Sequence, residues 1–165
     1  MKCAVVTMSD RSARGEREDL SGKVLQERLG AAGAEIAAYR VVPDERVLIS
    51  AALVDLSDEL SVDLILTTGG TGPAPRDVTS EATQAVLDRE MPGLAELLRF
   101  EGRKHTPFAV LSRGRAGIRG RTLIINLPGH PKAVEEGWQA LAPLLPTVVA
   151  LVRGEPGGDG ICRPA

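Results

Sequence analysis

Aromatic side chains are scarce in this chain of 165 residues, which has four of them: Tyr39, Phe100, Phe108 and Trp138. Proteins that bind single-stranded nucleic acids stack bases on aromatic rings, and nucleic-acid-binding domains are usually basic. This chain instead has a net charge of −2, from 20 Lys and Arg residues against 22 Asp and Glu residues. The composition therefore argues against a general nucleic-acid-binding protein and predicts no nucleic-acid partner.

Cysteines and long hydrophobic runs are also few. Cys3 and Cys162 are the two cysteines and lie near opposite ends of the sequence, so we expect no disulfide framework and a cytoplasmic location. No apolar run approaches the roughly 20 residues that a membrane-spanning helix needs, which predicts no membrane association. Because a chain of about this length typically forms one domain, we expect a single domain over residues 1–153 and a mobile C-terminal tail over residues 154–165.

Short apolar runs alternate with segments of helical periodicity, which is typical of α/β domains with a largely parallel sheet. The predicted strands cover residues 3–8, 34–42, 63–68, 108–112 and 122–126. The connector between the last two strands is too short for a crossover helix, so we expect these strands to be an antiparallel pair in a mixed sheet.

Helical periodicity follows each of the first three strands. The first helix begins near Leu20, after a polar loop, and the second begins near Asp44. The third is capped by Thr79 or Ser80 and broken at residues 91–93, with a short further helix over residues 94–104. A last helix starts near Pro131, and the prolines at positions 143 and 146 should kink or split it.

The most informative segment is the loop over residues 67–79, TTGGTGPAPRDVT. Its three glycines allow backbone N–H groups to approach a ligand closely and to form an anion-binding concavity, so phosphate is a suitable guest. The loop is neither a Walker A motif nor a dinucleotide-binding fingerprint. The alternative is an ordinary tight turn between a strand and a helix. Polar loops at residues 9–11, 43–45 and 128–131 should gather at the same rim.

Two carboxylates, Asp44 and Asp77, fall just after predicted strand ends at the start of predicted helices. Each could simply cap its helix. Alternatively the two converge and hold Mg²⁺, which prefers hard oxygen ligands shared between protein and nucleotide phosphates. Asp10 could be a third such group, or an exposed acid in a loop.

Four arginines cluster between the last two predicted strands, at positions 113, 115, 119 and 121. They could steer an anionic ligand, or they could form a solvated basic loop. The residues and their spacing alone thus predict a polar rim that suits phosphate, without naming a reaction.

At the 67–79 loop the sequence resembles a known family. TTGGTGPAPRDVT followed by EAT and REMPG is similar to the MogA/MoaB family of molybdenum-cofactor biosynthesis. Other blocks agree in order and spacing: the Ser-Asp-Arg loop at residues 9–11, Val-Pro-Asp-Glu at 42–45, Leu-Ser-Arg at 111–113 and Asn-Leu-Pro-Gly-x-Pro-Lys at 126–132. The resemblance runs from about residue 3 to residue 152.

This resemblance implies a fold and an activity. Members have a three-layer, doubly wound α/β fold with a mostly parallel sheet, and they assemble as trimers; the sequence leaves open whether two trimers pair into a hexamer. MogA-like proteins transfer AMP from Mg·ATP to the terminal phosphate of molybdopterin and release pyrophosphate. The adenylylated product passes to a separate metal-insertion protein. The expected cofactor is Mg²⁺, with ATP and molybdopterin as substrates.

The resemblance also implies roles for individual residues. Asp44 and Asp77 match the acids implicated in catalysis and in holding Mg²⁺. The implied substrate- and phosphate-binding residues are Ser9, Asp10, Thr68, Gly69, Gly70, Thr71, Gly72, Ser112, Pro128 and Gly129.

One alternative remains within this family. MoaB-type members include proteins that bind or carry molybdopterin without catalysis, and the presence of both Asp44 and Asp77 favours an active enzyme. The scarcity of aromatic residues further predicts that neither the pterin nor the adenine ring is sandwiched between aromatic rings, because Tyr39 and Trp138 occupy predicted core positions.

Overall fold

The structure is a computed structural model that describes residues 1–155. Within these residues the chain forms a six-stranded sheet in the order β2-β1-β3-β6-β5-β4. The strands are β1 (Lys2–Met8), β2 (Glu35–Val42), β3 (Leu64–Thr68), β4 (Arg89–Glu90), β5 (Ala116–Arg119) and β6 (Thr122–Leu127). The first four in that order are parallel, whereas β5 runs antiparallel to β6 and to the short β4. The predicted mixed sheet with an antiparallel pair is confirmed.

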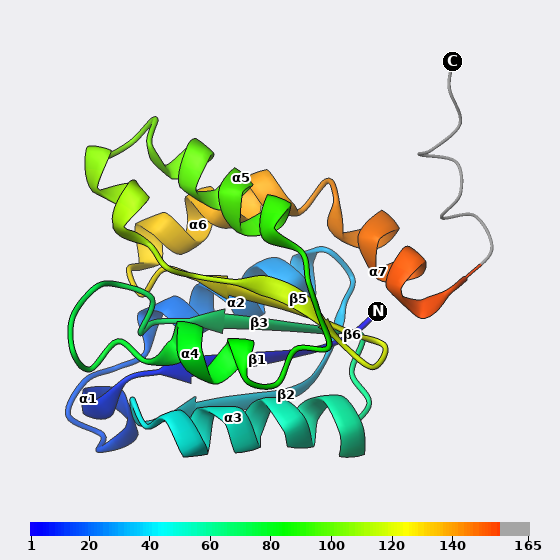
Figure 1. Cartoon of the computed structure of the whole chain (residues 1–165), viewed down its shortest axis with the longest axis horizontal. Coiled ribbons are helices and arrows are strands. Elements are labelled where there is room, and N and C mark those ends of the chain that lie inside the picture. The colour runs from blue at the N-terminus through cyan, green and yellow to red at the C-terminus, as the bar shows by residue number, and fades with distance from the viewer. Residues whose placement is uncertain (156–165) are drawn as a thin grey trace.

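Helices cover both faces of this sheet (Figure 1), so the molecule has three layers. One face carries α2, α5, α6 and α7, and the other carries α3, η1 and α4. The helical elements are α1 (Asp10–Ala13), α2 (Leu20–Ala31), α3 (Arg46–Val54), the π-helical turn η1 (Asp55–Glu59), α4 (Thr79–Gln84), α5 (Pro92–Gly102), the 3-10 turn η2 (Pro107–Leu111), α6 (Pro131–Leu141) and α7 (Leu145–Arg153).

The central strands are apolar on both faces because both faces are covered. On β3, Leu64 and Leu66 pack into the cluster under α2 and α6, whereas Ile65 packs into the cluster under α3. This alternation follows from the two-residue period of a strand. It explains why the sequence shows continuous apolar runs here rather than an alternation of polar and apolar residues.

The prediction of a strand over residues 108–112 is wrong, because Pro107–Leu111 form the turn η2. Thr106 caps this turn by accepting a hydrogen bond from the Phe108 N–H, and Pro107 has no N–H to donate to a sheet. Phe108 is 73% exposed. The antiparallel partner of β6 is β5, which lies inside the predicted connector, and Gly120 adopts a φ of 55° in the tight turn between them.

Three helix boundaries also differ from expectation. The short helix α1 forms in the predicted polar loop, because the Ser9 hydroxyl accepts a hydrogen bond from Ser12 N at 3.2 Å and caps it. The helix after β3 ends at Gln84 rather than at residues 91–93, and Pro92 begins α5, where a missing N–H costs nothing. The last helix is split into α6 and α7, as predicted.

Trp138 is buried, as predicted, but the core position predicted for Tyr39 is wrong. Tyr39 lies on the edge strand β2, is 40% exposed, and donates its hydroxyl hydrogen bond to Asp19 at 2.6 Å. Residues 156–165, which include Cys162 and most of the predicted tail, lie outside the described residues. Among residues 1–155, no helix has the length and apolar character to cross a membrane.

Candidate functional site

The carboxyl ends of β1, β2, β3 and β6 meet at one edge of the sheet because these strands are parallel. The chain passes from β1 to β2 on one side and then to β3 on the other side of β1. Such a reversal marks the crevice where open α/β sheets bind ligands. The four polar loops predicted to share a rim follow these strand ends and therefore lie around this crevice.

Residues 69–78, here called the glycine loop, join β3 to α4 at the centre of the crevice. Gly69 and Gly70 have φ values of 98° and 62°, which side-chain-bearing residues rarely adopt. A Cβ atom at Gly69 would collide with the Met8 carbonyl, and one at Gly70 would lie 3.0 Å from Asp44 Oδ1. The two glycines therefore allow the loop backbone to lie directly against the end of β1, at Met8, and against the residue Asp44 that follows β2.

Two hydroxyls predicted as helix caps bind loop carbonyls instead. Thr79 Oγ1 donates to Gly69 O at 3.0 Å, and Ser80 Oγ donates to Arg113 O at 2.7 Å. Both residues lie in the first turn of α4, whose N-cap is Val78. The predicted cap at Thr79 or Ser80 is therefore wrong: Thr79 holds the glycine loop, and Ser80 holds the segment at Arg113 against α4.

Asp10 and Asp44 bind each other through backbone amides. The Asp10 N–H donates to Asp44 Oδ2 and the Asp44 N–H donates to Asp10 Oδ1, both at 3.0 Å. Arg76 of the glycine loop donates to both Asp10 oxygens at 2.8–2.9 Å and to Glu45 at 3.1 Å. The Asp44 amide and the Arg76 guanidinium lower the pKa of Asp10, whereas burial raises the pKa of Asp44. Burial disfavours the ionised form of Asp44, so a cation beside this carboxylate would stabilise its charge.

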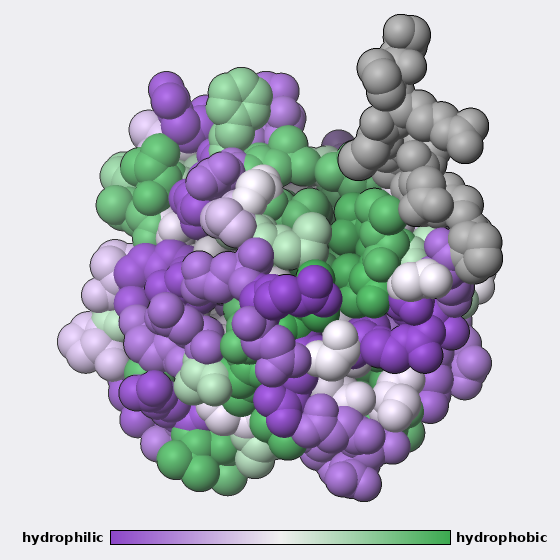
Figure 2. Space-filling view, turned by 45° about the vertical axis from the view of Figure 1, so that its right-hand side comes forward, coloured by the Kyte–Doolittle hydropathy of each residue, from purple (hydrophilic) through white to green (hydrophobic). Residues whose placement is uncertain are grey.

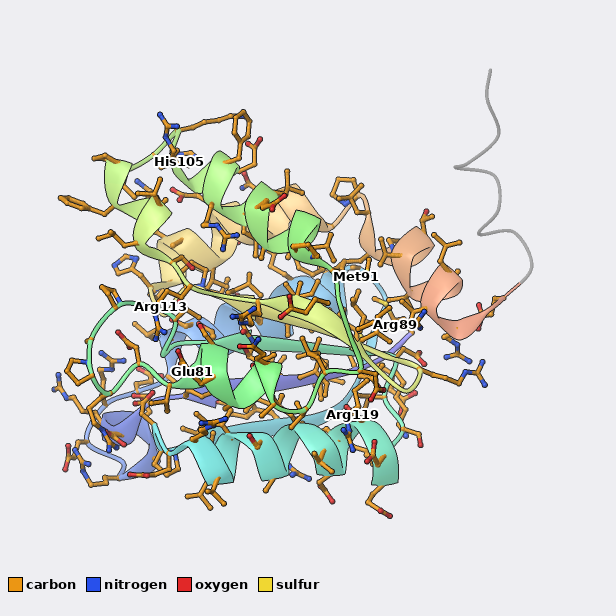
Figure 3. The ribbon with its side chains drawn as sticks, in the orientation of Figure 1. Glu81, Arg89, Met91, His105, Arg113 and Arg119 are labelled. Carbon is orange, nitrogen blue, oxygen red and sulfur yellow. The ribbon has the colours of Figure 1, made fainter. Side chains whose placement is uncertain are left out.

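Arg113 holds the glycine loop from the segment that follows η2. Its Nε donates to Gly72 O at 2.8 Å, its Nη2 donates to Asp77 O at 2.6 Å, and its guanidinium pairs with Glu81 of α4. Figure 3 labels Arg113 and Glu81, which approach each other from these different elements. The Arg113 guanidinium lowers the pKa of Glu81. Hydrogen bonds from one side chain thus fix the shape of the loop beside Asp77.

The other arginines of the predicted cluster are also bonded to protein groups. Arg115 pairs with Glu90 at 2.6 Å, and Arg119 pairs with Asp58. Arg121 donates to a backbone carbonyl of α7 at 2.8 Å. These side chains thus connect the β5–β6 hairpin to its neighbours at the surface, and steering of an anionic ligand by the cluster stays a prediction.

Neither Asp44 nor Asp77 caps a helix, since the N-caps of α3 and α4 are Glu45 and Val78. One oxygen of each aspartate accepts a backbone N–H, for Asp77 from Ala74 at 2.9 Å. Asp44 Oδ1 and Asp77 Oδ1 accept no hydrogen bond from the residues that the structure describes. Two hard oxygen donors suit Mg²⁺, which usually takes one or two carboxylates and leaves its other positions to water and substrate phosphates. Residues 1–155 contain no group of three or more His, Cys, Asp or Glu side chains that could hold a metal.

Two cavities open beside the glycine loop. The larger has a volume of about 450 Å³ and is lined by apolar side chains of α5, η2 and α6, among them Leu98 and Leu111. The smaller has a volume of about 180 Å³ and is more polar. Gly70, Asp77 and Gly129 line both, so the two cavities meet at the glycine loop.

Nearly all the predicted site residues line these cavities. The larger one is lined by Gly70, Thr71, Gly72, Asp77, Ser112, Pro128 and Gly129, and the smaller one by Ser9, Asp44, Thr68, Gly69, Gly70, Asp77 and Gly129. Asp10 lines neither cavity and lies behind Asp44. The structure thus brings these residues together, while the role of each stays a prediction.

Side-chain contacts connect the loops after β3 and β6. Thr68 Oγ1 donates to Pro128 O at 2.6 Å, and Ser21 Oγ of α2 donates to Gly129 O at 2.8 Å. A Cβ atom at Gly129 would lie 3.1 Å from Gly69 Cα. This close packing brings the amino end of α6 next to the glycine loop.

Sequence reasoning missed several residues that line the larger cavity. Asn126 is buried, and its amide donates to Thr67 and Thr83 at 2.9–3.0 Å. A polar residue at the end of an apolar strand was the available signal. Arg99 and Glu136 lie on helices, where spacing alone does not distinguish a cavity residue from a surface charge. Phe108 lines the cavity as well, although it was predicted to lie in a strand.

Comparison with known proteins decides the family. Residues 4–147 match the model of a protein family described as "Probable molybdopterin binding domain". The chain belongs to this family. The resemblance found in the sequence is thereby confirmed.

Individual members of the family match over most of the chain. A molybdopterin adenylyltransferase of Helicobacter pylori is 47% identical over 152 residues, which are 91% of this chain and 86% of that protein. One from Escherichia coli K12 is 45% identical over 139 residues, which are 82% of this chain and 71% of that protein. The crystal structure of the molybdopterin biosynthesis enzyme MoaB from Thermus thermophilus superposes with a TM-score of 0.88 at 52% identity, covering 94% and 98% of the two chains.

Proposed function

We propose that this protein is a molybdopterin adenylyltransferase, which transfers AMP from ATP to the terminal phosphate of molybdopterin. The observation that carries this proposal is the meeting of an apolar cavity and a polar cavity at one glycine loop, between Asp44 and Asp77. Such an arrangement suits two substrates whose phosphates must approach each other. The names of relatives that are 45–47% identical over most of this chain support the same activity.

In this proposal the larger cavity takes the pterin, because its lining is mostly apolar and its volume of about 450 Å³ is in the range of small-molecule sites. The smaller cavity takes the phosphate chain of ATP. Backbone amides of residues 69–72 hold the molybdopterin phosphate where the two cavities meet. Ser112 and Pro128 line the pterin side, whereas Ser9 and Thr68 line the ATP side.

The chemical step requires positioning and neutralisation of charge rather than a protein nucleophile. An oxygen of the molybdopterin phosphate forms a bond to the α-phosphorus of ATP. The bond from that phosphorus to the oxygen bridging to the β-phosphorus breaks, and pyrophosphate leaves with this oxygen. Asp44 and Asp77 would hold Mg²⁺, which when bound neutralises the charge of the phosphates. Asp10 and Arg76 keep Asp44 in position through the contacts described above.

The assembly and the cellular setting belong to the same proposal. We assign residues 1–153 to one molybdopterin-binding domain of a cytoplasmic homotrimer, or of a hexamer of two trimers, that passes its product to a separate metal-insertion protein. Exposed apolar side chains support an assembly, among them Phe100 at 64% exposure and Leu144 and Leu151 on and beside α7. Figure 2 shows hydrophobic residues gathered in the upper half of the face that it draws. Large exposed apolar areas commonly mark sites of protein association, and the mass in solution tests this.

The experiment that tests the function measures pyrophosphate release from Mg·ATP with and without added molybdopterin. We expect release that depends on molybdopterin. Binding of molybdopterin without any release would instead favour a non-catalytic, MoaB-type carrier. Failure to bind molybdopterin at all would contradict both functions.

A further inference from the structure

Glu136 of α6 is a carboxylate in the wall of the larger, mostly apolar cavity. Its side chain is 15% exposed. His105 Nδ1 lies 3.4 Å from Oε1, and Lys132 Nζ lies 4.0 Å from the same oxygen. Both contacts are ion pairs without hydrogen-bond geometry, and Glu136 accepts no hydrogen bond from residues 1–155. Figure 3 shows His105 just beyond the carboxyl end of α5.

A carboxylate at 15% exposure that accepts no hydrogen bond from the described residues keeps both oxygens available to a ligand. The neighbouring acid on the same helix has a different environment, because Glu135 pairs with Arg28 of α2 at 2.6 Å and accepts a hydrogen bond from Gln139. Glu136 therefore has unused acceptor capacity inside a cavity, which indicates a ligand with N–H donors.

The position of Glu136 along α6 fits one end of an elongated ligand. His130 caps this helix, and Gly129 contacts Gly69 of the glycine loop. With a rise of about 1.5 Å per residue, Glu136 lies about 9 Å along the helix axis from its cap. Ala133 and Gly137, which are three residues before and one residue after it, line the same cavity. A ligand with its phosphate at the glycine loop would thus extend along α6 toward Glu136.

We infer that Glu136 determines specificity for the pterin by accepting hydrogen bonds from its aminopyrimidinone edge, the N3–H and the 2-amino group. This inference rests on the proposed function for the identity of the ligand. A carboxylate presents two acceptor oxygens side by side, and the pterin edge presents two donors at matching separation. Of the other charged residues in the cavity lining, Arg99 donates to the segment after η2, and Asp77 belongs to the glycine loop, at the end of the cavity proposed for the phosphate.

The test compares Glu136→Gln with wild type in direct binding of two probes, 6-hydroxymethylpterin phosphate and its 2-oxo (lumazine) counterpart. The matched control is Glu135→Gln. We expect wild type to prefer the pterin over the lumazine, because the 2-oxo group would face the carboxylate. We expect Glu136→Gln to bind the pterin about 10- to 100-fold more weakly and to lose this preference, since charge-assisted hydrogen bonds are lost. Because the preference is a ratio, a partly unfolded variant would not imitate its loss.

The outcomes separate this inference from the proposed function. Pterin binding by Glu136→Gln within about twofold of wild type, with the preference retained, would overturn the inference even if wild type turns over molybdopterin. Pterin binding that depends on Glu136 in a protein that never releases pyrophosphate would support the inference and contradict the proposed function. Glu135→Gln should match wild type in both measurements; an equal loss in this control would overturn the assignment to Glu136.

Discussion

At the scale of single residues, the proposed activity depends on two carboxylates, Asp44 and Asp77, each of which accepts a backbone amide with one oxygen and keeps the other free. Replacing either by Asn retains an acceptor for the amide, so Asp44→Asn and Asp77→Asn should fold and bind molybdopterin. We expect each substitution to slow molybdopterin-dependent pyrophosphate release by about 100-fold or more, because charge at the reacting phosphates is no longer balanced. A steady-state assay with a separate binding measurement checks this. Wild-type rates in both variants would show that the carboxylates have another role.

A second residue-scale prediction concerns Gly70, whose φ of 62° and contacts leave no room for a side chain. Gly70→Ala should destabilise the protein by about 1–3 kcal/mol and weaken activity, because the new methyl group meets Thr79 and approaches Asp44. The matched control is Gly30→Ala in α2, where a Cβ atom meets open space. That change should be neutral or stabilise the fold by up to about 1 kcal/mol. Denaturant unfolding measures both, and equal effects would contradict the proposed strain.

At the scale of elements, Arg113 holds the glycine loop from outside, in addition to the hydrogen bonds that Thr79 and strand β6 make with Gly69. Arg113→Ala removes donors to the Gly72 and Asp77 carbonyls together with the pair to Glu81. We expect the value of kcat/KM to fall by about 10- to 100-fold, since a loosened loop misplaces the phosphate.

The control for this element is Arg121→Ala, which removes a contact between the β5–β6 hairpin and α7, away from the cavities. It should leave kcat/KM unchanged. A fall in kcat/KM of the same size in both variants would indicate a general loss of stability instead. Arg113→Lys, which restores the charge but not the fork of donors, should rescue only part of the activity.

The buried central elements were predictable from the sequence, because β1, β3 and β6 are covered on both faces and therefore show continuous apolar runs. The antiparallel strand β5 was not, since its residues 116–119 include a glycine and an arginine and pair within a tight hairpin. Exposed apolar residues such as Phe108 gave a false strand signal. Burial is a property of the tertiary structure, and a local pattern reports it only where both faces of an element are covered.

The candidate site, like the fold, could be predicted from the sequence only in part. The sequence pointed to the glycine loop and to both aspartates because they stand at strand ends, where ligands bind in such folds. It did not point to Arg99, Asn126 or Glu136, which enter the cavity from elements whose packing the sequence leaves open. The reciprocal bonds between Asp10 and Asp44 likewise join residues that are far apart along the chain.

At the scale of the whole molecule, Cys3 reports on cooperative unfolding. It is fully buried in β1, and burial raises the pKa of its thiol to about 12. In a Cys162→Ser variant, we expect alkylation of Cys3 at pH 8 to be at least about a thousandfold slower than in the unfolded chain, because exposure requires opening of the central sheet. Rapid alkylation without denaturant would contradict a closed core around β1.

Net charge is also a property of the whole molecule, and it does not decide what a single crevice binds. A chain with a net charge of −2 can bind two polyanionic substrates, because the whole-molecule charge does not describe one crevice. In the proposed site the local positive character comes from backbone amides and from the cation held by Asp44 and Asp77. Of the four aromatic residues, Phe108 alone lines the larger cavity, at one wall, so the prediction that no ring is sandwiched between aromatic side chains stays a prediction.

The most direct measurement follows the phosphorus atoms of ATP. Wild-type protein is incubated with molybdopterin and Mg·ATP that carries a radiolabel at either the α- or the γ-phosphate. Adenylyl transfer predicts that the α-label appears on molybdopterin and that the γ-label leaves in pyrophosphate. An α-label that stays on free nucleotide, or a γ-label that appears on molybdopterin, would contradict it.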